Sequence, residues 1–136
     1  MARIICLDYG GKRTGIAVTD PLQIIATALE TVPTKELTNY LKKYFAKEPV
    51  ELILIGYPLN LNDSPTHATG LVNTAIKLLT KEFPTIPIQK IDERFTSKMA
   101  SRAMVEMGMK KKHRQKKENT DMIAATIMLQ EYLQNQ

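Results

Sequence analysis

Four acidic residues stand where side chains from distant parts of the chain could meet. Asp8 ends an apolar run near the N-terminus, and Asp121 begins the last apolar helical pattern. Asp92 and Glu93 end another apolar run. In α/β sheets, side chains at the carboxyl ends of strands reach an open crevice. Carboxylates gathered there repel one another, and Mg²⁺ or Mn²⁺, which prefer oxygen ligands, relieve this repulsion. The chemistry indicated is metal-assisted hydrolysis of phosphodiester bonds.

Each of these acids also has a structural interpretation. Asp8, just before a glycine pair, could cap a hairpin turn. Asp92 and Glu93 are neighbours in an extended segment and point to opposite faces, so at most one faces the site. Asp121 shares its helical face with an apolar stripe, and an acid there is costly to bury unless it is paired or bound to metal. The stripe consists of Ala125, Met128, Leu129 and Tyr132.

Other classes of site are disfavoured. The two histidines, His67 and His113, are far apart and are expected at the surface, and no Cys/His spacing suits zinc. A single cysteine, Cys6, forms no internal disulfide, which favours a reducing cytoplasm. We expect no signal peptide and no membrane span, because the apolar runs are short.

Positive charge is concentrated in residues 110–117, which hold six of the 19 Lys and Arg residues and no acid. The remaining chain has 13 basic and 14 acidic residues, so the net charge of +5 comes from this segment. It suits a phosphate backbone, whose binding releases counterions, although a solvated basic loop would have the same composition. The predicted nucleic-acid contacts here are Lys110, Lys111, Lys112, Arg114, Lys116 and Lys117.

The hydrophobic pattern predicts one α/β domain spanning residues 1–136. Strands are expected at Arg3–Asp8, Thr14–Thr19 and Ile24–Val32, with a turn at residues 10–13 joining the first two. Two further strands, Glu51–Gly56 and Ile86–Asp92, alternate with helices. This order implies a mixed five-stranded sheet with an antiparallel three-strand start and helices on both faces. Four helices are expected. The first lies near Lys35–Lys47, and the second follows a loop at residues 57–65 and ends at about Phe83. The third is expected at Ser97–Met107 and the fourth from about Thr120 to Leu133.

A glycine-rich turn, residues 10–15, follows Asp8 and carries Lys12 and Arg13. Its backbone amides and two cations could contact phosphate, but it lacks the pattern of a Walker loop, and a single glycine-rich turn is weak evidence.

Four segments taken in order resemble the YqgF/RuvX family of Holliday-junction resolvases, also described as pre-16S ribosomal RNA nucleases. Residues 8–20 (DYGGKRTGIAVTD) resemble its opening motif and residues 56–60 (GYPLN) its second. Residues 92–97 (DERFTS) resemble the third, and residues 120–125 (TDMIAA) with 129–133 (LQEYL) the fourth. The resemblance covers essentially the whole chain.

The resemblance implies an RNase H-like fold and an acidic, metal-assisted site on Asp8, Glu93 and Asp121. It also places Lys12, Arg13 and Arg94 at positions that contact phosphate or hold the acids in place. The family usually has a glycine in the loop after the second motif, whereas this chain has Asn62-Asp63-Ser64. That difference leaves any role of this loop open.

The leading hypothesis is a metal-dependent endonuclease, acting in 5′-end maturation of pre-16S rRNA or on Holliday junctions; a C2 homodimer would suit symmetric cutting of a junction. One alternative is a non-catalytic RNA-binding ribosome-assembly factor, whose affinity would survive Asp8→Asn without any cleavage. Another is a small actin- or sugar-kinase-like nucleotide-binding domain, which an ATP titration would reveal. Such proteins clamp ATP between two domains, and this chain offers one.

Overall fold

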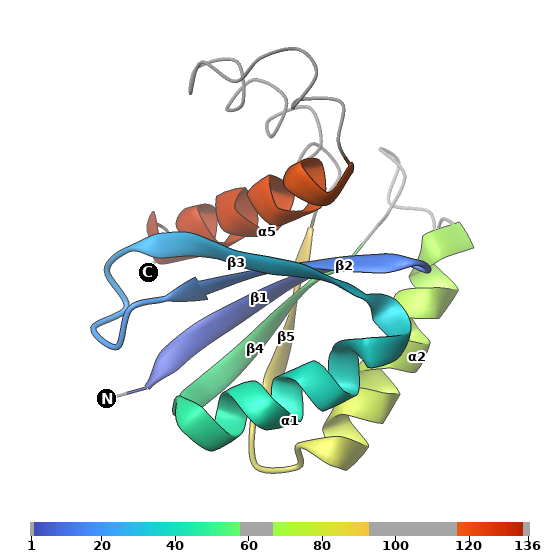
Figure 1. Cartoon of the computed structure of the whole chain (residues 1–136), viewed down its shortest axis with the longest axis horizontal. Coiled ribbons are helices and arrows are strands. Elements are labelled where there is room, and N and C mark those ends of the chain that lie inside the picture. The colour runs from blue at the N-terminus through green and yellow to red at the C-terminus, as the bar shows by residue number, and fades with distance from the viewer. Residues whose placement is uncertain (1, 58–66, 93–116, 135–136) are drawn as a thin grey trace.

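A five-stranded mixed sheet forms the centre of the molecule (Figure 1), in a computed structural model that describes residues 2–57, 67–92 and 117–134. Its strands are β1 (Arg3–Tyr9), β2 (Arg13–Thr19), β3 (Ala26–Pro33), β4 (Val50–Tyr57) and β5 (Ile88–Asp92). The strand order is β3-β2-β1-β4-β5. The first three strands pair antiparallel, whereas β4 pairs in parallel with both β1 and β5. The predicted antiparallel start and mixed sheet are therefore confirmed.

Helices cover both faces of this sheet, as predicted (Figure 1). One face carries the 3₁₀ turn η1 (Thr34–Glu36), α1 (Leu37–Lys47) and α2 (His67–Glu82). The other carries α5 (Lys117–Gln134), which packs across β1, β2 and β3. The helix predicted at residues 97–107 lies outside the described residues. No helix in the described part of the chain is both long and apolar enough to cross a membrane.

The central strands supply two separate cores because successive side chains point to opposite faces of a sheet. In β1, Ile5 and Leu7 pack toward α1 and α2, whereas Ile4 and Cys6 pack toward α5. Strands buried on both sides need continuous apolar runs, which explains the sequences IICL (residues 4–7) and LILIG (residues 52–56). The core under α5, called the α5-side core below, consists of Ile4, Cys6, Ala17, Leu54, Ala125, Met128 and Leu129.

The third strand was predicted to begin at Ile24, but it begins at Ala26. The Asp20 carboxylate accepts hydrogen bonds from the N–H groups of Ile24 and Ile25, at 2.7 and 2.9 Å, and so holds both residues in a loop. Gln23 turns the chain with a φ of 58°. The backbone hydrogen bonds to Asp20, that from Ile25 first, hold the pKa of its carboxyl below the ordinary value.

Three other boundaries differ by two or three residues from the prediction. The helix expected from Lys35 starts as a 3₁₀ turn and becomes α-helical at Leu37. The fifth strand begins at Ile88, because the Ile86 N–H donates to the Phe83 carbonyl in a turn. The last helix begins at Lys117, three residues early. Glu118 is the second residue of this helix, and an acidic side chain there interacts favourably with the positive end of the helix dipole. The sequence is therefore compatible with a helix that begins at Lys117.

Candidate active site

Asp8 lies near the carboxyl end of β1, on the face of the sheet covered by α5. Ile4 and Cys6, two and four residues earlier in the same strand, both belong to the α5-side core. Because side chains alternate along a strand, Asp8 shares their face. Asp8 is half-buried, whereas the residues before it are buried. The carboxylate therefore lies at the boundary between the α5-side core and solvent.

Glycines occupy both strands beside Asp8. Gly15 of β2 is its direct antiparallel partner. On the other side, Leu7 pairs with Ile55 of β4, which places Gly56 level with Asp8. Both glycines lie on the α5 side, since each is two residues from a member of the α5-side core. Neither neighbouring strand therefore has a side chain level with Asp8 on this face.

The turn from β1 to β2 lies at the same end of the sheet and carries Lys12 and Arg13. Thr34 fastens this turn: its N–H donates to the Lys12 carbonyl at 2.9 Å, and its hydroxyl donates to the Gly10 carbonyl at 2.5 Å. The Thr34 and Thr14 hydroxyls also share a hydrogen bond of 3.0 Å. Lys12 is exposed and Arg13 is half-buried. Two predicted phosphate contacts are thus held beside Asp8.

Replacing Gly10 with alanine should break this turn. A Cβ on Gly10 would lie 2.6 Å from the backbone oxygen of Arg13, too close for any rotamer change to relieve. We expect Gly10→Ala to lower the free energy of unfolding by about 1–3 kcal/mol, as overpacking does, and to weaken nucleic-acid binding by displacing Lys12. Urea denaturation and filter binding measure the two effects.

The matched control is Gly11→Ala in the same turn. A Cβ there would make ordinary contact with the Leu71 side chain, at 3.6 Å. Gly11→Ala should change the free energy of unfolding by no more than roughly 0.5 kcal/mol. Equal losses from the two alanine variants would show that the turn tolerates a shift at Gly10.

Asp121 lies in α5, the helix that covers the face on which Asp8 stands. It was predicted to begin this helix, but the helix starts at Lys117, so Asp121 is the fifth residue and lies in the second turn. One helical turn later comes the buried Ala125, followed by Met128 and Leu129 of the α5-side core. The backbone position of Asp121 thus continues the stripe that packs on the sheet. Its side chain lies outside the described residues.

The strand β5 ends next to β4 and leads into Glu93. Gly56 pairs with Ile91, and Tyr57 pairs with Asp92. Ile91 packs against the α5-side core. Glu93 itself and the side chain of Asp92 lie outside the described residues.

The other predicted contacts are placed only in part. Among the described residues, no group of three His, Cys, Asp or Glu side chains could hold a metal ion; of the three predicted ligands, only the Asp8 side chain belongs to that part of the chain. Lys117 is the first residue of α5. Outside the described residues lie Arg94, Lys110, Lys111, Lys112, Arg114 and Lys116, and with them the side chain of Lys117.

Sequence reasoning missed the roles of Gly15, Gly56 and Thr34. Gly56 ends the apolar run LILIG, and a glycine at the end of a buried strand signals close approach by backbone or ligand. Thr34 carried no such signal, because its contact with Gly10 joins residues 24 positions apart.

The whole chain matches known proteins. Residues 2–135 match the sequence profile of the family described as RuvX, Holliday junction resolvase. A Bacteroides thetaiotaomicron protein named "Putative pre-16S rRNA nuclease" is 51% identical over 99% of this chain and 98% of its own length. A protein of the same name from Flavobacterium johnsoniae is 51% identical over 98% of this chain and 96% of its own.

Among solved structures, T. thermophilus RuvC in complex with a Holliday junction substrate has a similar fold. The TM-score is 0.61 with 13% identity, covering 99% of this chain and 96% of RuvC. The strand order 3-2-1-4-5 and the helices on both faces agree with this RNase H-like fold. The chain belongs to the RuvX family and is a nuclease with the RNase H-like fold.

Proposed function

We propose that this protein is a metal-dependent endonuclease whose active site consists of Asp8, Glu93 and Asp121. The observation that carries the proposal is the position of Asp8, half-buried between two glycines under the helix that bears Asp121. That helix crosses the face of β1, and its N-terminal end lies toward the end of the sheet where β1, β4 and β5 finish (Figure 1). In the sequence, Glu93 comes directly after β5.

These residues fit Mg²⁺ or Mn²⁺. All three proposed ligands are carboxylates, which both ions prefer, and the residues level with Asp8 on both neighbouring strands are glycines, which add no bulk beside the carboxylate. When bound, one or two ions would activate a water for in-line attack and stabilise the leaving oxygen. Asp8, fixed within a paired strand, would hold one edge of the site rigidly, while Asp121 would close it from the helix.

The basic residues around this edge would supply most of the affinity for nucleic acid. Lys12 and Arg13 lie on the turn beside Asp8, and Arg94 directly follows Glu93. The segment 110–117 leads into α5 and adds six more cations. Contacts of this kind bind phosphates and position the strand without reading its sequence. Specificity would then come from the shape of the substrate.

Two structured substrates fit this description. Relatives at about half identity carry the name of a pre-16S rRNA nuclease, which favours the 5′ end of that precursor as the first substrate. The family description favours a Holliday junction, whose paired strands would suit a homodimer with two sites. The cytoplasm is the proposed compartment for both, because its reducing state suits a chain whose single cysteine, Cys6, is buried in the α5-side core.

Cleavage assays with and without divalent cations test this proposal. Precursor rRNA fragments and synthetic four-way junctions are incubated with the protein in EDTA, Mg²⁺, Mn²⁺ or Ca²⁺. We expect cutting only with Mg²⁺ or Mn²⁺ and complete recovery when Mg²⁺ is added back after EDTA. The preferred substrate is the one cut at the lower enzyme concentration. Full activity in EDTA would contradict metal dependence.

A further inference from the structure

A groove runs along the outer side of α1. Two adjoining hollows of about 230 Å³ each follow this helix, and they share Tyr40 and Lys43. The first hollow begins at Val32 and Pro33 of β3, and the second ends at Lys47. Together they are called the α1 groove below. Because the groove is open along one helix, it suits an extended ligand rather than a compact one.

The second hollow is lined by two tyrosines and two lysines, without a carboxylate. These residues are Tyr40, Lys43, Tyr44 and Lys47. The two rings are nearly parallel, at 11° with centroids 6.5 Å apart, and each is half-buried against the core, which fixes its position. The two lysines are exposed and lie one helical turn apart on one side of α1. The hollow thus places positive charge beside fixed aromatic rings.

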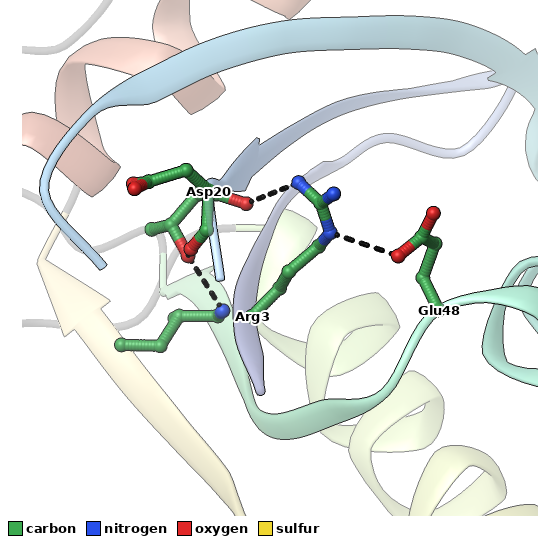
Figure 2. A network of polar contacts seen from close by, with 5 residues as sticks. Arg3, Asp20 and Glu48 are labelled. Atoms are coloured by element: carbon green, nitrogen blue, oxygen red, sulfur yellow. Dashed lines mark hydrogen bonds and ion pairs between the residues drawn. The ribbon is translucent and has the colours of Figure 1, made fainter. Parts of the chain in front are cut away.

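The carboxylates near the groove are engaged elsewhere or lie outside the second hollow. Arg3 pairs with Glu48 at 3.2 Å and holds it beside the start of β1 (Figure 2). Glu30 of β3 accepts a hydrogen bond from the Tyr40 hydroxyl. Burial of Tyr40, together with this bond, raises the pKa of Tyr40 to about 12, so the ring carries no charge at neutral pH. Glu36 lines the first hollow but not the second, which therefore keeps its positive charge.

The lysines of the second hollow are available to a ligand. Among the described residues, Lys43 and Lys47 form no ion pair. By contrast, Lys42 of the same helix pairs with Glu82 of α2 at 3.2 Å. Phosphate groups suit two such ammonium groups, because binding them releases counterions.

The groove begins beside the turn that carries Lys12. Thr34 directly follows Pro33, and its N–H donates to the Lys12 carbonyl at 2.9 Å. From there α1 runs toward the start of β1, where the Arg3 N–H donates to the carbonyl of Pro49 (Figure 1). The groove therefore leads from the catalytic end of the sheet toward the opposite end. A strand bound at the Lys12 turn could continue into it without a break.

We propose that the α1 groove binds an unpaired segment of the substrate strand. Lys43 and Lys47 would contact its phosphates, while Tyr40 and Tyr44 would stack on its bases. This is the combination of charge and aromatic rings that proteins use to bind single strands. A duplex keeps the faces of its bases inside and would use only the lysines. The substrate class is then a structured RNA or DNA with a single-stranded extension. Only the location of the cutting point rests on the proposed active site; binding in the groove does not.

Fluorescence anisotropy in EDTA tests this site without cleavage. The probes are an RNA and a DNA hairpin duplex, each with a blunt end or with a single-stranded tail of about 12 nucleotides. For the unaltered protein, stacking of one base should make the tail worth at least about fivefold in affinity. Lys43→Gln with Lys47→Gln should remove most of that gain and reduce the salt slope for tailed probes by roughly 0.7 for each lost phosphate contact.

Tyr44→Leu separates stacking from charge. Loss of the ring should weaken binding of tailed probes about fivefold or more and leave binding of blunt probes unchanged. Tyr44→Phe keeps the ring and should retain the affinity of the unaltered protein. Circular dichroism confirms that each variant is folded. If Tyr44→Leu bound tailed probes normally, the groove would be a charged surface only, and its assignment to an unpaired strand would be wrong.

The matched control is Lys77→Gln with Lys81→Gln on α2. These lysines are also exposed and one helical turn apart, so the variant loses the same charge on the same face of the sheet. It should bind tailed and blunt probes normally. Equal affinity of the unaltered protein for both kinds of probe, or equal losses from the two lysine pairs, would overturn the proposal. Asp8→Asn should keep the full gain from the tail, so failure of the groove and failure of the active site can be told apart.

Discussion

Asp8→Asn should abolish cleavage while nucleic-acid binding persists. The substitution keeps the size of the side chain and removes the charge that would hold the cation. Loss of groups that only support a metal ligand costs 10–100-fold, so loss of a ligand itself should lower the cleavage rate by more than about 100-fold. Affinity should be unchanged or slightly higher, because Lys12 and Arg13 remain and one negative charge is gone. Single-turnover cleavage and filter binding separate the two effects.

The control for Asp8→Asn is Glu51→Gln, which removes the same charge at the other end of the sheet. Glu51 is exposed at the start of β4, and a glutamine there can still accept the hydrogen bond from Gln23. This variant should cleave at the normal rate. If Asp8→Asn cleaved as fast as Glu51→Gln, Asp8 would be a turn residue and the site would lie elsewhere.

Leu129→Ala should cause a large loss of stability in the core under α5. Leu129 is fully buried in the α5-side core against the central strands. A buried Leu→Ala change costs about 2–5 kcal/mol, part of it for the cavity left behind. For a domain of this size that corresponds to a fall in Tm of roughly 10 °C. Differential scanning calorimetry measures it.

The cleavage rate of Leu129→Ala should fall as well at temperatures where the protein remains folded. Leu129 lies two helical turns after Asp121, so a loosened α5 positions that carboxylate less well. Leu78→Ala, at a partly exposed leucine of α2, should cost under roughly 1 kcal/mol and leave cleavage unchanged. A fully active Leu129→Ala enzyme would mean that the packing of α5 does not position the site.

Most of the fold could be predicted from the hydrophobic pattern of short stretches of the sequence. The run IICL, residues 4–7, is apolar at every position, as expected for a strand covered on both faces, and β1 is the central strand. The stripe from Ala125 to Leu129 predicted which face of the last helix is buried. The opening hairpin followed from two β-rich runs separated by a glycine turn. These features depend on residues close together in the chain.

Features that depend on distant contacts were harder to predict. The start of β3 is set by the Asp20 carboxylate, which competes with strand pairing for the N–H groups of Ile24 and Ile25. The spacing of the acids was visible in the sequence, but the glycines beside Asp8 became apparent only from the register of three strands. Ile24 and Ile25 were predicted as the start of the third strand, so their exposure in the preceding loop was not foreseen.

Titration with Mn²⁺ tests most directly whether three distant carboxylates share a divalent cation. Free Mn²⁺ is followed by electron paramagnetic resonance as protein is added, for the unaltered chain, Asp8→Asn, Glu93→Gln and Asp121→Asn, with Asp92→Asn and Glu51→Gln as controls. The account predicts that each of the first three substitutions weakens binding at least tenfold and that both controls bind normally. Equal Mn²⁺ affinity in all six proteins would contradict it.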